Sequence, residues 1–132
     1  MQSSDFLLFF GLIRRAGRLA IGIENAAAAC QSGKARLVVL AGDASEGSLS
    51  PLKRLCLEKE VLTVSPGFGK AELGGALGIG ECSAAAVTDT ALAISVCRKL
   101  GLKEHAARLE IKLEREKRRK AKKMAKISKR GK

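Results

Sequence analysis

The sequence predicts an α/β fold in which a small, mostly buried sheet lies between two layers of helices. The first observation is the continuous apolar run 37–40, which follows Gly33 and precedes Gly42. A strand without polar alternation is typical of a sheet covered on both faces. The second observation is that candidate helices and strands alternate along residues 1–102, which indicates an α/β/α sandwich.

Five segments of this body predict helices. Their evidence is apolar residues at helical spacing together with capping residues at the ends. The first runs from caps at residues 3–5 to Gly17, the second covers 24–32, the third starts with Ser50 as its cap and Pro51 in its first position, the fourth covers 70–77, and the fifth starts at Thr88 or Asp89 and stops at Gly101.

Four short segments predict strands. The central one covers 36–41, two others cover 61–64 and 84–87, and a fourth covers 18–21. Each is bounded by glycine, serine or proline residues that favour turns. Because ligands of open α/β sheets gather where strands end, Asp43 and Ser45 belong to the first region to search for function.

The charge of the chain is concentrated at its C-terminal end. Residues 103–132 contain 14 Lys and Arg and 4 Glu, a net charge of +10, out of a total of +12, which leaves +2 for residues 1–102. A polycation of this kind indicates a polyanionic partner, and RNA, DNA or an anionic membrane surface would satisfy the charge.

The basic segment 103–132 is predicted to be helical or disordered. Leu102, Ala106, Leu109 and Leu113 have helical spacing, whereas apolar residues become sparse after Arg115, so we expect the end to be frayed or disordered. The alternative to a function is a solvated extension. We favour nonspecific contacts with phosphates, carried by Arg115, Lys117, Arg118, Arg119, Lys120, Lys122 and Lys123.

Several functional classes are disfavoured by the sequence. The four cysteines have no Cys-x-x-Cys spacing and no nearby histidine, so we expect no metal, no cofactor and reduced thiols in a cytoplasmic protein. The single histidine, His105, lies outside the body. With neither a phosphate-binding loop nor a dinucleotide-binding motif, we expect no enzymatic activity. No segment is long enough to span a membrane.

Four phrases of the body resemble the ribosomal-protein family that binds kink-turn RNA, of the L-seven-Ae and L-thirty-e type, and especially its small bacterial members. The phrases are GLIRRAGRLAIG at 11–22, SGKARLVVLAGDAS at 32–45, KAELGGALG at 70–78 and AVTD at 86–89, and they occur in the family's order. The resemblance implies a four-stranded mixed sheet, no catalytic activity and recognition of a sharply bent RNA, in which non-canonical pairs open the groove.

The resemblance also implies where RNA would bind. Polar groups at the start of the second helix match Gly22, Glu24 and Asn25, and the loop before the last strand matches Ile79, Gly80, Glu81 and Cys82. The alternatives are that Glu24 and Asn25 only cap a helix, that the apolar residues of the loop turn inward, and that Asp43 and Ser45 cap a turn.

One departure from the family weakens the implied RNA contact. The family has a lysine one turn after the helix start, where this chain has Ala28. The basic segment 103–132 could compensate for the missing charge, and so could five cations of the body: Arg14, Arg15, Arg18, Lys34 and Arg36. The expected partner is therefore a structured RNA, from the ribosome or elsewhere, bound by a monomer. The alternative function is a protein–protein interaction module of the same fold.

Overall fold

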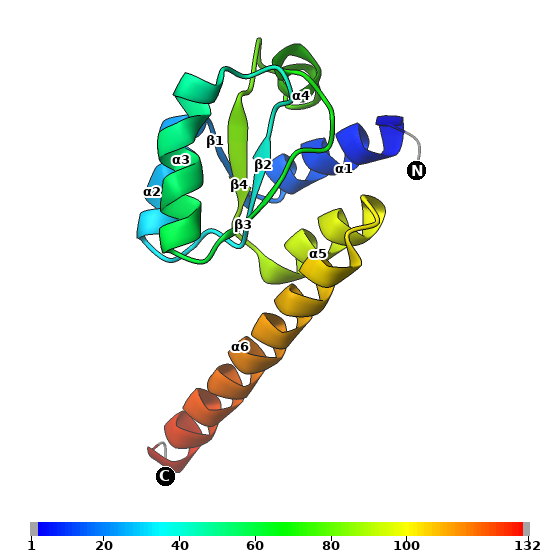
Figure 1. The fold of residues 1–132 in the computed structure, drawn as a ribbon. Coiled ribbons are helices and arrows are strands. Elements are labelled where there is room, and N and C mark those ends of the chain that lie inside the picture. The colour runs from blue at the N-terminus through cyan, green and yellow to red at the C-terminus, as the bar shows by residue number, and fades with distance from the viewer. Residues whose placement is uncertain (1–2, 131–132) are drawn as a thin grey trace.

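The structure, a computed structural model, describes residues 3–130 and contains a four-stranded mixed sheet (Figure 1). The strands are β1 (Leu19–Ile21), β2 (Leu37–Leu40), β3 (Leu62–Val64) and β4 (Ala84–Val87). Their order is β1-β4-β2-β3, with β2 and β3 parallel and the other two pairs antiparallel. All four residues of β2 and of β4 are buried, which confirms the central, two-sided strand that the apolar run predicted.

Six helices surround or extend this sheet in the described chain. They are α1 (Ser3–Arg15), α2 (Ile23–Gln31), α3 (Glu46–Glu58), α4 (Lys70–Ala76), α5 (Thr90–Lys99) and α6 (Lys103–Arg130). Helices α2 and α3 cover one face of the sheet, and α1 and α5 lie on the other, while α6 extends away from the body (Figure 1). The predicted α/β/α sandwich is confirmed.

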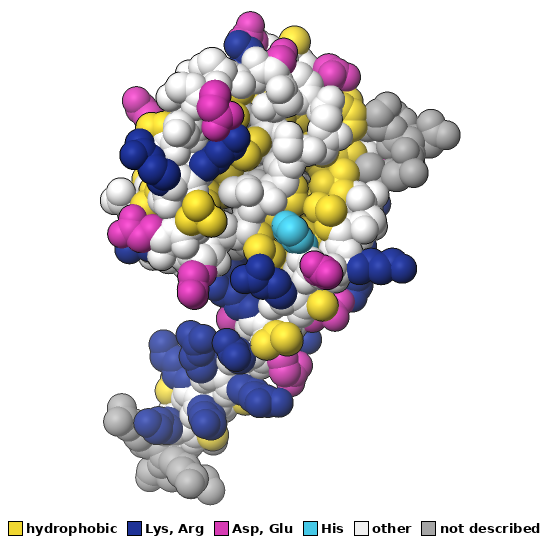
Figure 2. Space-filling model, viewed as in Figure 1, with side chains coloured by type: hydrophobic (Ala, Val, Ile, Leu, Met, Phe, Trp, Pro, Cys, Tyr) yellow, Lys and Arg dark blue, Asp and Glu magenta, His cyan; other side chains and the backbone are white. Residues whose placement is uncertain are grey.

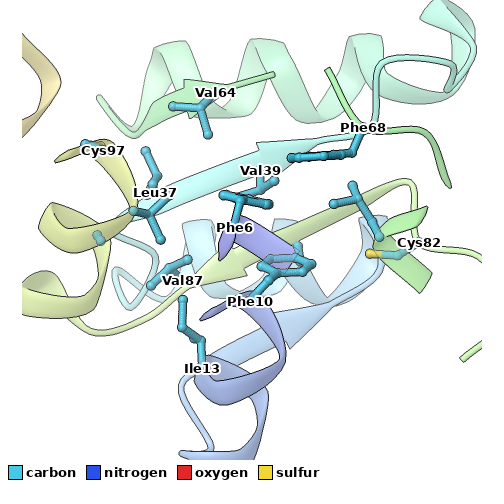
Figure 3. Packing of buried hydrophobic residues seen from close by; sticks show 14 of the residues in the cluster. Phe6, Phe10, Ile13, Leu37, Val39, Val64, Phe68, Cys82, Val87 and Cys97 are labelled. Carbon is cyan, nitrogen blue, oxygen red and sulfur yellow. The ribbon is translucent and has the colours of Figure 1, made fainter. Parts of the chain in front are cut away.

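Two hydrophobic clusters form the core because neighbouring side chains of β2 point to opposite faces. Leu37 and Val39 pack with α1, α4 and α5, whereas Val38 and Leu40 pack with α2 and α3. The larger cluster is centred on Phe6, whose ring stacks on Phe10 at 5.6 Å and on Phe68 at 5.1 Å between centroids (Figure 3). Three of the four phenylalanines are therefore fully or almost fully buried in the core.

Helix α3 begins five residues earlier than the sequence predicted, so the assignment of Ser50 as its cap was wrong. Ser45 is the N-cap, and its hydroxyl accepts a hydrogen bond of 3.2 Å from the Ser48 amide. Pro51 consequently lies inside the helix. The longer helix buries Leu49, which is 3% exposed, and this tertiary contact outweighs the poor fit of proline at an interior position.

Helix α6 is continuous to Arg130, which corrects the expectation that order ends after Arg115. Its first turns belong to the core, because Ala106 and Leu109 are buried in the larger cluster. Beyond them, Ala, Lys, Arg, Glu and Met are all good helix formers, so propensity supports the helix where packing does not. The boundary between a body at 1–102 and a segment at 103–132 stays a prediction.

Candidate nucleic-acid interface

The start of α2 is built around Gly22. This residue is the N-cap of α2 with φ 98° and ψ 157°, a conformation that is essentially restricted to glycine. Its amide donates a 2.8 Å hydrogen bond to the Ala84 carbonyl oxygen, and its own carbonyl accepts from the Ala26 amide at 2.9 Å. Gly22 thus turns the chain from the edge strand β1 into α2 and fixes the helix start against β4.

Two exposed polar side chains lie on the first turn of α2. The Asn25 amide group donates a 2.8 Å hydrogen bond to the Ile21 carbonyl oxygen, which orients it next to the turn. Glu24 is exposed as well. The first amides of a helix have no intrahelical acceptor, so this turn presents N–H donors, the oriented Asn25 amide group and the exposed Glu24 carboxylate.

The loop between α4 and β4 lies beside this helix start and is held rigidly. The Cys82 amide donates to the Lys70 carbonyl oxygen at 3.0 Å, and the Ala41 amide donates to the Ser83 carbonyl oxygen at 2.9 Å. Helix α4 also touches the loop: a Cβ atom on Gly74 would lie 2.6 Å from the Gly80 carbonyl oxygen. Since Ala84 bonds Gly22, residues 22–25 and 79–83 form one edge, which we call the glycine end.

The four loop residues predicted to contact RNA differ in exposure. Gly80 and Glu81 are exposed, and Ile79 is half-buried against the larger cluster. Cys82 is 2% exposed, so its predicted contact with a ligand was wrong and the inward alternative holds for this side chain. Its thiol donates to the Ala84 carbonyl oxygen at 3.4 Å. Burial raises the pKa of this thiol, which keeps it neutral.

Asp43 and Ser45 both stabilise helix starts. Ser45 caps the helix that follows it, as the capping alternative predicted, whereas Asp43 binds a helix start 27 residues further along the chain. Asp43 accepts a 2.7 Å hydrogen bond from the Lys70 amide at the first turn of α4, and Ser45 caps α3. Asp43 therefore connects the end of β2 to α4. Both side chains remain exposed at the same end of the sheet as Gly22.

Arg18 and Arg36, two of the predicted compensating cations, are not brought to the glycine end. The Arg36 amide bonds the Val87 carbonyl oxygen at 2.8 Å and the Thr88 amide bonds the Arg18 carbonyl oxygen at 3.0 Å, whereas Gly22 bonds Ala84. Val87 and Ala84 are the two ends of β4. Arg18 and Arg36 thus lie at the opposite end of the sheet, which we call the arginine end.

Lys34 and Arg15 are also away from the helix start at Gly22. Lys34 is exposed directly after the C-terminal end of α2, and its amide donates to the Ala29 carbonyl oxygen at 2.9 Å. Arg15 is exposed at the C-terminal end of α1. These side chains therefore lie away from the start of α2, because α2 and the strands separate the two ends by their own length. Arg14, in contrast, donates to the Leu77 carbonyl oxygen just before the α4–β4 loop. Whether any of these cations compensates for Ala28 stays a prediction.

Arg36 is instead part of a polar cluster that the sequence analysis did not identify. Its Nε donates to the Thr90 hydroxyl at 3.1 Å, its Nη1 donates to the Gly33 carbonyl oxygen at 2.7 Å, and Glu116 of α6 lies 3.6 Å away. Thr90 in turn donates to the Glu116 carboxylate at 2.8 Å. The cluster attaches α6 to the start of α5. Residues so far apart in the chain give no local signal that could have revealed it.

The seven cations assigned to phosphate contacts are all exposed on α6. Figure 2 shows Lys and Arg gathered along the helix where it leaves the body, in contrast to the mixed charges on the body. The glycine end and its surroundings carry charges of both signs: five carboxylates and two lysines, and also Arg54 beside Glu24 and Arg14 beside Leu77. The carboxylates and lysines are Glu24, Asp43, Glu46, Glu72 and Glu81, with Lys53 and Lys70. Lys53 pairs with Glu46 at 3.1 Å, and Lys70 pairs with Glu81 at 3.6 Å.

The cysteines are buried thiols in the core. Cys30 of α2 and Cys56 of α3 place their sulfur atoms 3.9 Å apart, and burial raises the pKa of Cys56 to about 12. Thiols of this kind are poor nucleophiles and poor metal ligands at neutral pH. Within residues 3–130, no group of three or more His, Cys, Asp or Glu side chains is arranged to hold a metal ion. None of the helices in this range has the length and apolar character needed to span a membrane.

The fold and its two ends define a class of protein: a small α/β/α sandwich with an exposed helix start and a fixed loop at one end of the sheet. Comparison with known proteins identifies the family. The model of the ribosomal protein L7Ae/L30e/S12e/Gadd45 family matches residues 10–96, and the chain belongs to this family. The match ends before α6. No curated protein matches the chain.

Two solved structures illustrate the similarity. A protein with unknown function from Bacillus halodurans C has 27% identity and a TM-score of 0.68, over 73% of this chain and 96% of its own. The 15.5kD RNA binding protein of Giardia lamblia has 25% identity and a TM-score of 0.64, over 78% of this chain and 88% of its own.

Proposed function

We propose that the protein is a non-catalytic RNA-binding protein that recognises a kinked, kink-turn-like RNA through the glycine end. Family membership and the similarity to the Giardia lamblia RNA binding protein support RNA as the ligand. We further propose that it acts as a monomer in the cytoplasm, on ribosomal RNA or another structured RNA.

The observation that carries the proposal is the joining of the α2 start to the α4–β4 loop. The hydrogen bond between the Gly22 amide and the Ala84 carbonyl oxygen, 2.8 Å long, places exposed Glu24 and Asn25 beside exposed Gly80 and Glu81. An A-form duplex hides its base edges in a deep, narrow groove, whereas a kink exposes some edges and extrudes nucleotides. The backbone amides of the α2 start, the Asn25 side chain and the α4–β4 loop together form a rigid surface that suits a kinked RNA.

The chemistry of the edge assigns a different role to each group. The Glu24 carboxylate only accepts hydrogen bonds, so it would bind amino or imino groups of bases, while the Asn25 amide can both donate and accept. The free amides of the α2 start would hold a phosphate. Gly80 would allow a nucleotide to approach the loop backbone closely.

The test compares two RNAs at fixed salt: a kink-turn, and the same RNA with its G·A pairs changed to Watson–Crick pairs. We expect tighter binding of the kinked RNA in a gel-shift assay. The double variant Glu24→Ala, Asn25→Ala should reduce the preference by about tenfold or more, because each lost base contact is worth about 1–3 kcal/mol. Equal affinity of the wild type for both RNAs would refute specific recognition.

A matched control removes one carboxylate and one amide from the far ends of α2 and α3. Gln31 and Glu58 are both exposed, so Gln31→Ala, Glu58→Ala should fold normally and retain the preference. If this control lost the preference as well, the glycine end would not be the recognition surface.

One observation favours a second candidate function, a protein–protein interaction module. A groove of about 540 Å³ lies between α2 and α3. Its lining combines apolar residues, Ile23, Ala27, Pro51, Leu52 and Leu55, with the polar residues Glu24, Gln31, Arg54 and Glu58. Together with Ala28 and the carboxylates around the glycine end, this groove could accept an apolar peptide segment. A wild-type protein that binds neither RNA in the test above would favour this candidate.

A further inference from the structure

The cations of α6 are not distributed evenly around the helix. Six of them follow one another at intervals of four and three residues, which places them on a single face. We call this set the cationic stripe: Arg108, Lys112, Arg115, Arg119, Lys122 and Lys126. At a rise of about 1.5 Å per residue, the stripe is about 27 Å long.

Three carboxylates of α6 bind partners outside this stripe, although Glu116 itself lies beside it, four residues after Lys112. They are the three carboxylates of the described helix from Arg108 onward. Glu110 pairs with Arg98 of α5, Glu114 lies 3.8 Å from Arg118, and Glu116 binds Thr90 and Arg36. The stripe therefore keeps its full positive charge along its length.

The first half of the stripe forms one wall of a cleft with the body. The cleft has a volume of about 320 Å³, and four stripe residues line it: Arg108, Lys112, Arg115 and Arg119. The opposite wall consists of Ala35, Val61 and Leu62 at the β2–β3 side of the sheet. Arg36, Glu60 and two apolar residues of α6, Leu109 and Ile111, complete the lining. Arg36 is paired with Glu116, so the cleft has the four stripe cations against one carboxylate, Glu60.

The Glu116 cluster fixes this cleft in place. Glu116 accepts from Thr90 at 2.8 Å and lies between the stripe residues Arg115 and Arg119 in sequence. Its side chain is 28% exposed and that of Arg36 is 20% exposed, so the attachment is partly shielded from solvent. Consequently the angle between α6 and the sheet is set by contacts immediately beside the cationic residues.

We propose that the cationic stripe and its cleft bind the phosphodiester backbone of a double-stranded RNA segment, separate from the segment held at the glycine end. This inference rests on the proposed RNA-binding function but concerns another surface. Arg36 and the stripe lie at the arginine end of the sheet, so the two surfaces face different parts of a ligand. The protein thereby connects two helical segments of a structured RNA.

Charge and composition favour RNA over an anionic membrane surface. From Lys117 to Ile127 the helix has seven cations and two large apolar side chains, Met124 and Ile127. Helices that lie in a membrane surface need a substantial apolar face, which this segment does not provide. A row of cations with little apolar area is typical of binding to a polyphosphate backbone, with strong dependence on salt.

The experiment compares two triple variants of the full chain that lose the same charge from the same helix. The stripe variant is Lys112→Gln, Arg115→Gln, Arg119→Gln. The control variant is Lys117→Gln, Arg118→Gln, Lys120→Gln, which lies off the stripe. The sequence alone assigned phosphate contacts to these three cations as well, and the present proposal restricts such contacts to the stripe. Binding to a fully paired RNA duplex, without any kink, is measured by fluorescence anisotropy over a series of salt concentrations, and circular dichroism checks the helix content.

We expect the plot of log K against log[salt] to be less steep for the stripe variant, with a slope smaller in magnitude by about 2–3, as for three lost phosphate contacts. Its affinity at low salt should fall by about tenfold or more. The control should change the slope by less than about 1. Equal losses in both variants would overturn the proposal, since the charge would then act diffusely. So would wild-type binding to anionic phosphatidylserine vesicles without binding to the duplex.

The result stays separate from that of the proposed function. The duplex has no kink, so it reports on the stripe even if the glycine end proves not to discriminate. Conversely, the stripe variant should keep the ratio of affinities for the kinked and the fully paired RNA. If the ratio collapsed in the stripe variant alone, the assignment of two separate surfaces would be wrong.

Discussion

The glycine end and α6 differ in charge and in how their polar groups are held in place. At the glycine end the nearby lysines, Lys53 and Lys70, are paired with carboxylates, and the position of every group is set by backbone hydrogen bonds such as those of Gly22 and Cys82. On α6 the positions are set by one helix, and the binding groups are long exposed side chains. The comparison teaches that shape recognition and charge can be assigned to separate elements, one rigid and one cationic.

The strongest test of this comparison is truncation of the chain after Glu116. Residues 117–132 contain ten Lys and Arg and no acidic residue. Their removal should reduce affinity for any RNA by about 100-fold or more near physiological salt, while the preference for the kinked RNA persists. The truncated protein keeps Ala106, Leu109 and Glu116, so its core and the attachment to α5 are retained. Fluorescence anisotropy measures both quantities, and a loss of preference would contradict the division of roles.

The second largest effect is expected for Gly74→Ala, which tests the glycine end. The added Cβ would meet the Gly80 carbonyl oxygen at 2.6 Å and Glu81 Cα at 2.7 Å, so the loop must move. We expect a loss of about 1–3 kcal/mol in the free energy of unfolding and a reduced preference for the kinked RNA. Duplex affinity, which depends on α6, should not change.

The neighbouring glycine provides the control for this variant. A Cβ atom on Gly75 would have no heavy atom within 4 Å, and the residue is exposed in the same helix. Gly75→Ala should therefore stabilise the protein by about 0.5–1 kcal/mol and keep the preference. Chemical denaturation and the gel-shift pair measure the two effects. Similar behaviour of both variants would show that the loop contact has no special role.

The smallest effect is expected for Glu116→Gln, which weakens the attachment of α6 to the body. The amide keeps the size of the side chain but loses the charge that faces Arg36 at 3.6 Å. We expect a loss of about 1 kcal/mol in stability, because hydrogen bonds to a charged group exceed those to a neutral one. Hydrogen exchange should become faster in α6 around residue 116 and not in α2. Unchanged exchange there would mean that core packing alone positions the helix.

The sequence predicted much of the body because its signals are local. The apolar run of β2 and the capping residue Asp89 of α5 lie where the structure has them. The fold and family that the four phrases implied are confirmed. The roles of Glu24, Asn25 and Gly80 as RNA contacts stay predictions.

The remaining features depend on contacts between distant residues. Cys82 turns inward because its thiol bonds Ala84 below the loop, although an apolar loop residue could equally face a ligand. Arg36 is tied to Thr90 and Glu116, which follow it by 54 and 80 positions. Whether a cation is free to bind or already used in the fold is decided by such partners, and no periodicity in the sequence encodes them.

The strand order β1-β4-β2-β3 has a consequence for biosynthesis. The edge strand β1 has β4 as its neighbour in the sheet, and the Gly22 amide is held by Ala84, the first residue of β4. At about 5–20 residues per second, the ribosome produces β4 roughly 3–13 s after β1. During that interval the nascent chain already carries Glu24 and Asn25 but lacks the strand whose first residue holds Gly22, so the start of α2 cannot be fixed in place before β4 has been made.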